Sequence, residues 1–198
     1  MMSLGLALQT LTNLALVSPG AGVPPPWIVT AAPHAALPTL RVTPDHALRI
    51  EAASAAGTAV YRLSRPLAPR EQAGALSWRW WTATPIVHAA LRDPTRDDAP
   101  ARVVVIFDDG RTLAYSWGNA EPVGDVFSGS RGMRHAVVVC RRADDANGSW
   151  YLESHDPFAD YRRAFGHAPH AIVAVGVAAA TNHLGVRTVA EVSDLSWD

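Results

Sequence analysis

The sequence contains no lysine and only one cysteine among its 198 residues. All 17 basic residues are arginine, 18 residues are acidic, and the net charge is −1. Because DNA- and RNA-binding proteins use a surplus of basic residues to attract phosphates, we expect no nucleic-acid partner. A single thiol cannot form an internal disulfide, and Cys140 lies in the apolar run AVVVC. We expect it to be a buried strand residue without a catalytic role.

Motifs of common enzyme and metal sites are also lacking. There is no phosphate-binding loop, dinucleotide-binding fingerprint or GxSxG elbow. Zinc needs three or four converging ligands, mostly nitrogen or sulfur. His167 and His170 flank Ala-Pro and His183 lies in another loop, so these histidines do not form such a set. We therefore expect no metal ion and no cofactor.

The N-terminal segment has no charged side chain before Arg41. Residues 4–22 read LGLALQTLTNLALVSPGAG, an apolar stretch followed by small residues that resembles a secretory leader, although the usual positive start is missing. The stretch is too short and too polar to predict a membrane-spanning helix. We expect residues 1–25 to be an apolar leader or a disordered tail, and residues 26–198 to be one domain. Residues 1 to about 22 should pack poorly on that domain or form an isolated apolar helix. The leader interpretation predicts a periplasmic or extracellular protein; a cytoplasmic protein with an apolar tail is the alternative.

The rest of the chain consists of short segments rich in β-branched and aromatic residues, separated by Gly, Pro, Asp or Asn. The strand candidates are residues 27–31, 39–43, 47–53, 58–64, 75–82, 102–109, 112–117, 135–142, 149–154, 170–180 and 188–197. Repeated short strands and turns are typical of all-β proteins. We predict a two-sheet antiparallel β-sandwich of the jelly-roll kind.

Three local signals add detail to this prediction. Asp108-Asp109-Gly110 predicts a hairpin turn, because Asp-Gly tolerates the positive φ that such turns require. Residues 157–165 predict one short helix, capped by Asp156 and ended by Gly166. Residues 83–101 form the longest expected loop, which is polar enough to lie in solvent or to line a site.

Several motifs occur in a characteristic order. They are LSWRW at 76–80, DDAPAR at 97–102 followed by VVVIF, LAYSW at 113–117, Trp150-x-x-Glu153, and DYRRAFG at 160–166. From about residue 27 to residue 197, this order resembles a bacterial family of unknown function, domain-of-unknown-function family 3047. The resemblance implies a jelly-roll sandwich similar to carbohydrate-binding modules and galactose-binding-like domains. It implies no established activity.

The chain departs from the usual pattern of that family in three places. Ala114 stands where the family usually has Asn, and His155 stands where it usually has Arg. The family's Asp-rich turn is replaced by AAATNHLG at residues 178–185. If the relatives share a polar or calcium-binding site there, we expect this chain to have lost or rebuilt part of it.

Strand alternation divides the tryptophans of LSWRWWT, residues 76–82. Trp78 and Trp80 share one face of the strand, and Arg79 and Trp81 share the other. We expect Trp78 and Trp80 to fill the core. Trp81 with Arg79 is a candidate sugar platform, because sugar C–H groups pack on a flat indole while hydroxyls bond to charged groups. An edge tryptophan that shields a helix is the alternative.

Arg102 opens an apolar strand, where it shares a face with Val104 and Ile106. A buried arginine needs a carboxylate, and we expect Glu153 and Asp160 to be its partners. Such a group would either pin the helix to the sheet as an ion pair or form the polar wall of a ligand site. The two carboxylates could also serve as acid and base in glycoside cleavage.

The hypothesis we favour from the sequence is a non-catalytic β-sandwich module that binds a glycan or another polar cell-envelope ligand. The candidate ligand-binding residues are Arg79, Trp81, Arg102, Tyr115, Glu153 and Asp160. A polysaccharide hydrolase or lyase that uses Glu153 and Asp160 is the second hypothesis, and a structural or interaction domain is the third. All three stay open because one fold serves many functions. The sequence leaves the oligomeric state open.

Overall fold

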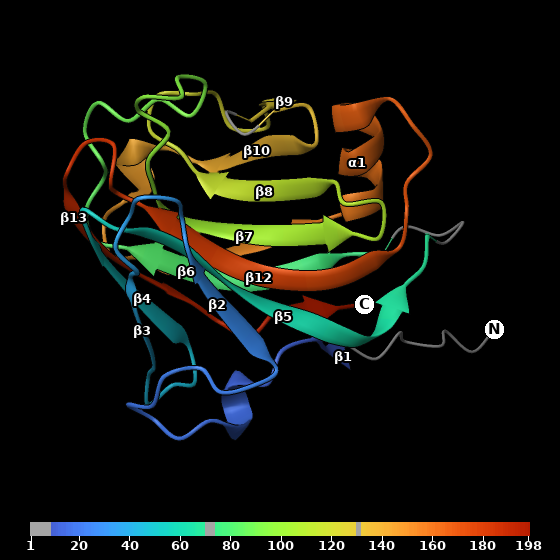
Figure 1. Ribbon diagram of the computed structural model, residues 1–198, viewed down its shortest axis with the longest axis horizontal. Coiled ribbons are helices and arrows are strands. Elements are labelled where there is room, and N and C mark those ends of the chain that lie inside the picture. Colours follow the sequence, from blue (N-terminus) through green and yellow to red (C-terminus); the bar gives the residue numbers. More distant parts are fainter. Residues whose placement is uncertain (1–8, 70–73, 130–131) are drawn as a thin grey trace.

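The computed structural model describes residues 9–69, 74–129 and 132–198, which form two stacked seven-stranded sheets (Figure 1). Sheet A runs in the order β1-β14-β6-β13-β4-β3. Strands β13 and β14 pair with successive parts of one edge of β6, and β11 pairs with its opposite edge. Sheet B runs in the order β2-β5-β12-β7-β8-β10-β9. Neighbouring strands are antiparallel except for β8 and β10, which are parallel. The predicted all-β jelly-roll sandwich with one short helix is confirmed.

The elements have the following bounds. Sheet A contains β1 (Gln9–Thr10), β3 (Thr39–Val42), β4 (Leu48–Ala53), β6 (Leu76–Thr82), β11 (Tyr151–His155), β13 (Arg187–Val192) and β14 (Ser196–Trp197). Sheet B contains β2 (Trp27–Ala31), β5 (Ala56–Leu67), β7 (Ala99–Phe107), β8 (Thr112–Trp117), β9 (Val126–Ser128), β10 (His135–Arg141) and β12 (Ile172–Ala180). Two 3-10 helices, η1 (Leu14–Leu16) and η2 (Ala143–Asp145), and the α-helix α1 (Pro157–Phe165) complete the described chain.

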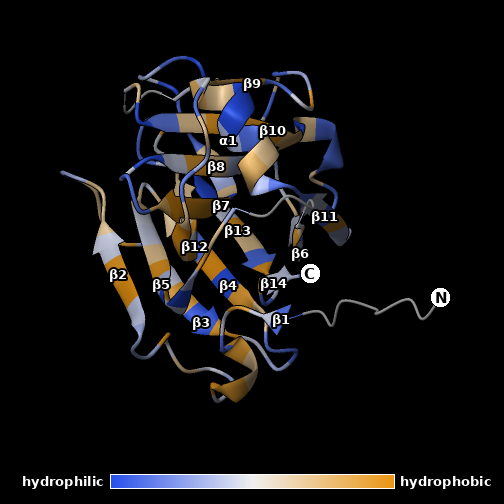
Figure 2. Ribbon diagram, turned by 90° about the vertical axis from the view of Figure 1, so that its right-hand side faces the viewer, coloured by the Kyte–Doolittle hydropathy of each residue, from blue (hydrophilic) through white to orange (hydrophobic). Residues whose placement is uncertain are grey.

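The core lies between the sheets and is made of alternate residues from each strand. Hydrophilic and hydrophobic residues alternate visibly along β4 (Figure 2). On β6, Trp78 and Trp80 are 2% and 0% exposed, and their rings meet edge to face at 5.5 Å. They pack against Tyr115 and Trp117 of β8, which come from the opposite sheet. The prediction that Trp78 and Trp80 belong to the core is confirmed.

Helix α1 covers one end of the sandwich, beside β8, β9 and β10 (Figure 1). The carboxylate of Asp156 accepts hydrogen bonds from the backbone N–H groups of Phe158 and Ala159, and Gly166 ends the helix at φ 69°. These are the predicted bounds and caps. Asp156 bonds to backbone N–H groups that have no partner within the first turn, and Gly166 adopts the left-handed conformation that ends a helix.

The predicted hairpin turn joins β7 to β8 and also holds the helix. Gly110 has φ 80°, as the turn requires. Asp109 accepts hydrogen bonds from Arg111 and from the hydroxyl of Tyr161 on α1. Burial would raise the pKa of Asp109, but these hydrogen bonds outweigh it and lower the pKa to about 2.

The N-terminal segment packs on the sandwich from residue 9 onward. Strand β1 pairs with β14, and Leu11, Leu14 and Val17 are 7%, 2% and 6% exposed. The carboxylate of Asp194 accepts hydrogen bonds from Thr12 and from the backbone of Leu14. The expectation that residues 1 to about 22 pack poorly is therefore wrong for residues 9–17, because Leu11, Leu14 and Val17 are buried in the core. Residues 1–8 lie outside the described part of the chain.

Candidate ligand-binding site

The six residues predicted for the site lie in three separate places. Arg79 and Trp81 lie on the outer face of sheet A, and Arg102 lies on the outer face of sheet B. Tyr115, Glu153 and Asp160 lie in the interior, each no more than 7% exposed. A single ligand site made of all six is excluded by this arrangement.

The outer face of sheet A carries two tryptophans side by side. The ring of Trp150 is edge-on to the ring of Trp81, with centroids 6.4 Å apart and an interplanar angle of 72°. Trp150 is 42% exposed, whereas Trp81 is half-buried and donates its indole N–H to Glu191 at 3.0 Å. The guanidinium of Arg79 lies 5.7 Å from the Trp150 ring. We call this patch the tryptophan surface; it consists of Trp150, Trp81, Arg79, Glu191 and Leu152.

The pairing of three strands brings this surface together. Trp81 of β6 lies opposite Glu191 of β13, and Arg79 of β6 lies opposite Leu152 of β11. Trp150 directly precedes β11 and so falls next to Trp81. Alternation predicted the outward face of β6, but the neighbours on β11 and β13 depend on strand pairing. Trp150, Leu152 and Glu191 were therefore missed as site residues, although Trp150 belongs to one of the motifs.

A shallow hollow of about 180 Å³ adjoins the tryptophan surface. Its lining consists of Ser77, Trp78, Arg79, Leu152, Ser193, Asp194 and Ser196. Arg79 and Leu152 thus belong both to the hollow and to the tryptophan surface. Hydroxyl, carboxylate and guanidinium groups here offer donors and acceptors beside an exposed ring. This combination suits a ligand that has both C–H faces and hydroxyl groups.

Ion pairs extend the surface across sheet A. The guanidinium of Arg49 on β4 donates hydrogen bonds to Glu191 at 2.9 Å and to Glu51 at 3.0 Å. The hydrogen bond from Arg49 lowers the pKa of Glu51, which keeps that carboxylate charged. Glu191 in turn accepts the indole N–H of Trp81. The orientation of the Trp81 ring is thus held by a carboxylate that is itself held by an arginine.

Arg102 lies on the outer face of sheet B, whereas the residues expected to pair with it lie in the interior. Its ion pair is with Asp97, in the loop before β7, and it also donates to the carbonyl oxygen of Asp97 at 3.1 Å. The expected pairing with Glu153 and Asp160 is wrong, because both carboxylates point into the core. Arg102 shares the outer face of β7 with Val104 and Ile106, as alternation predicted.

A hollow of about 220 Å³ crosses the outer face of sheet B beside Arg102. Its lining is mostly apolar and contains no tryptophan, tyrosine or phenylalanine: Thr58, Val60, Asp97, Arg102, Val104, Ile106, Thr112, Ala114, Gly129, His135, Ala136, Val137 and Ala178. The loop at residues 83–98 covers part of this face, where Leu91 packs on Val137 and Val139. Without a tryptophan, tyrosine or phenylalanine ring, this hollow offers a sugar less than the tryptophan surface does.

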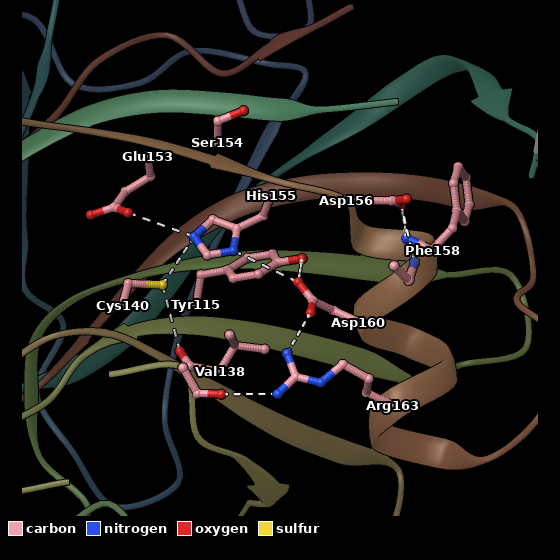
Figure 3. A network of polar contacts seen from close by, with 12 residues as sticks. Tyr115, Val138, Cys140, Glu153, Ser154, His155, Asp156, Phe158, Asp160 and Arg163 are labelled. Carbon is pink, nitrogen blue, oxygen red and sulfur yellow. Dashed lines mark hydrogen bonds and ion pairs between the residues drawn. The ribbon is translucent and has the colours of Figure 1, made fainter. Parts of the chain in front are cut away.

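The three interior residues belong to a polar network centred on His155 (Figure 3). The Nε2 atom of His155 lies 3.6 Å from Glu153 Oε2 and 3.5 Å from Cys140 Sγ. The Nδ1 atom lies 3.7 Å from Asp160 Oδ2, which accepts a hydrogen bond from the hydroxyl of Tyr115 at 3.0 Å. Burial alone would lower the pKa of His155, but hydrogen bonding to Asp160, Cys140 and Glu153 outweighs it and raises the pKa to about 11.

This network does not suit the acid–base role considered for Glu153 and Asp160. The carboxylates are each 7% exposed, they stand on opposite sides of one imidazole ring, and neither lines either of the two hollows. A glycosidic bond must lie between its two catalytic carboxyl groups, and the imidazole occupies that position. Sequence reasoning missed His155 and Cys140, because only the packing of the two sheets brings β10 and β11 together here.

Comparison with known proteins agrees with the fold. The profile of the family described as protein of unknown function (DUF3047) matches residues 33–196. No curated protein is significantly similar to the chain in sequence. One similar solved structure is the xyloglucanase domain of NopAA, a type three effector from Sinorhizobium fredii, in complex with cellobiose. Its sequence is 11% identical, the TM-score is 0.51, and the match covers 87% of this chain and 92% of that chain.

Two further solved structures are similar over most of their length. The family 11 carbohydrate-binding module of the cellulase Lic26A-Cel5E of Clostridium thermocellum is 10% identical, with 98% of this chain and 95% of that one covered and a TM-score of 0.49. The winged bean acidic lectin complexed with methyl-α-D-galactose is 10% identical, with 90% and 94% covered and a TM-score of 0.46. At such identities a likeness concerns the fold alone.

Proposed function

The chain belongs to the family of proteins of unknown function DUF3047, and from its own surface we propose that it is a non-catalytic module that binds a glycan through the outer face of sheet A. The observation that carries the proposal is the exposed ring of Trp150, edge-on to Trp81 and next to a hollow lined by serine, arginine and aspartate side chains. The fold by itself does not establish the function, although a sandwich of this kind holds cellobiose in the xyloglucanase domain of NopAA.

The chemistry of the tryptophan surface fits a sugar better than an apolar or a strongly charged ligand. An indole face presents a large, rigid apolar area with little conformational entropy to lose. Arg79 and Glu191 contact the rings as charged donor and acceptor, and with Arg49 and Glu51 beside them the two positive and two negative charges balance. A neutral molecule with alternating C–H and hydroxyl groups can satisfy both features at once.

A glycan array followed by titration calorimetry with the best-bound oligosaccharide tests this proposal. Trp150→Ala is expected to weaken binding by about tenfold or more, which corresponds to about 1.4 kcal/mol. Ile28→Ala is the matched control, because Ile28 is 54% exposed on β2 of sheet B and its truncation leaves sheet A unchanged. If Trp150→Ala binds every glycan as the parent protein does, the tryptophan surface is not the site.

We further propose that the protein acts outside the cytoplasm, where a polysaccharide or cell-envelope ligand would be found. The support is the proposed glycan ligand rather than the apolar N-terminal segment, because residues 9–17 of that segment pack on the sandwich as part of the fold. No helix in the described part of the chain is long and apolar enough to cross a membrane. Mass spectrometry of the protein from fractionated cells tests the location, and recovery of full-length chain from the cytoplasm alone would contradict it.

A further inference from the structure

Three side chains that are all metal ligands in other proteins converge inside the sandwich. The sulfur of Cys140 and Oε2 of Glu153 approach the same ring nitrogen, Nε2 of His155, at 3.5 and 3.6 Å (Figure 3). The three ligand atoms all lie within 4.8 Å of one another. Cys140 comes from β10 of sheet B, whereas Glu153 and His155 come from β11 of sheet A. The cluster therefore links the two layers of the fold.

Two of the three separations between ligand atoms, those to Nε2 of His155, agree with those of a tetrahedral metal site. Zinc binds sulfur at about 2.3 Å and imidazole nitrogen or carboxylate oxygen at about 2.0–2.2 Å, so neighbouring ligand atoms lie about 3.3–3.6 Å apart. The two distances to Nε2 match these values. An ion could therefore bind with small side-chain movements and without a change in the backbone.

The surrounding groups orient the ligands as the outer partners of a metal site do. Asp160 lies 3.7 Å from Nδ1 of His155, on the side of the ring away from Cys140, and Tyr115 donates a hydrogen bond to Asp160. The other oxygen of Glu153, Oε1, accepts hydrogen bonds from Trp80 at 3.0 Å and Arg141 at 2.6 Å. Nε2 of the imidazole thus faces both the sulfur of Cys140 and Oε2 of Glu153.

We propose that Cys140, Glu153 and His155 bind a divalent transition-metal ion of the zinc class, which clamps β10 to β11 across the sandwich. A thiolate, an imidazole and a carboxylate together suit zinc better than magnesium or calcium, which prefer oxygen ligands alone. The expectation of no metal was based on other histidines, in loops after α1.

A nucleophilic role for Cys140 is the competing interpretation, since the order Cys140, His155, Asp160 also occurs in thiol enzymes. Such an enzyme must expose its sulfur to a substrate. Cys140 is 4% exposed, it lies within a strand, and it lines neither hollow. A small ion can reach the cluster more easily, because the side chain of His155 is 22% exposed.

Cobalt(II) titration of the full chain tests the metal site, because thiolate-bound cobalt shows a sulfur-to-metal charge-transfer band in the near ultraviolet. Cys140 is the only cysteine in the sequence, so this band reports on one position. We expect the band in the folded protein, its displacement by zinc, and its loss in His155→Gln and Glu153→Gln. Asp160→Asn should weaken metal binding by about 10- to 100-fold, as removal of an outer partner does. His170→Gln is the matched control, because that histidine pairs with Asp108 away from the cluster, and it should leave the titration unchanged.

A thermal-shift measurement covers the case in which a variant in the cluster folds poorly. Zinc should raise the melting temperature of the parent protein and should not raise that of Cys140→Ala, which removes a buried thiol with little change in volume. Absence of the band from the folded parent protein would overturn the proposal. So would a band that keeps its affinity in both His155→Gln and Glu153→Gln, or an equal zinc-induced shift in Cys140→Ala. These outcomes are independent of glycan binding at sheet A.

Discussion

Replacement of Trp80 by alanine is expected to remove a large part of the stability of the domain. Trp80 is 0% exposed, and its ring packs on Trp78 at 5.5 Å and on Trp117 at 5.4 Å. Truncation of a buried tryptophan costs about 3–5 kcal/mol. Its indole N–H also donates to Glu153 at 3.0 Å, and a lost hydrogen bond to a charged group adds about 1.5–3 kcal/mol. The total is comparable to the free energy of unfolding of a typical domain, about 5–15 kcal/mol.

Urea denaturation followed by circular dichroism measures this loss. Trp80→Phe keeps most of the ring volume and loses the hydrogen bond, so it should cost less than Trp80→Ala and thereby separate the two contributions. Trp150→Ala is the matched control on the outer face of sheet A, where 42% of the residue is exposed, and it should cost about 1 kcal/mol or less. If Trp150→Ala destabilises the domain as much as Trp80→Ala, the assignment of inner and outer faces is refuted.

Three further predictions concern other parts of the fold. Asp109→Asn should lower the free energy of unfolding by about 2 kcal/mol at neutral pH, because the pKa of this carboxyl is lowered to about 2 in the folded protein. The difference in free energy between the variant and the parent protein should shrink as the pH falls from 4 towards 2, and a difference that stays constant would contradict this prediction. Gly176→Ala should cost about 1–3 kcal/mol in the same assay, because a Cβ atom there would lie 2.3 Å from the carbonyl oxygen of Ala59 on the neighbouring strand. Leu14→Ala should cost about 2–5 kcal/mol if the N-terminal segment is part of the folded domain, and no loss of melting temperature would show that it is not.

Features that depend on local physics could be predicted from the sequence alone. The helix at residues 157–165 was predicted with its caps, because its end groups are satisfied by residues adjacent in the chain. The turn at Gly110 and the division of LSWRWWT into two faces likewise depend on neighbouring residues only. The order of motifs also predicted the family, whose profile matches residues 33–196. The two-sheet sandwich follows from many such short, alternating segments.

Features that depend on which strands meet were decided only by the tertiary structure. Alternation placed Arg102 and Val104 on one face of their strand. Which face of sheet B points outward depends on how the two layers pack, and this determines that Arg102 pairs with Asp97. Trp150 became a neighbour of Trp81 through the pairing of β11 with β6.

The same reason explains the interior cluster and the N-terminal segment. Cys140 and His155 meet because strands from opposite sheets face each other across the core. Leu14 is buried because residues 9–10 pair with the last strand of the chain. Strand pairing and layer packing join residues that are far apart in sequence, and a shift of one residue in register would send each side chain to the opposite face. Periodicity within a segment determines how its residues divide between two faces, and only the assembled sheets determine what each face meets.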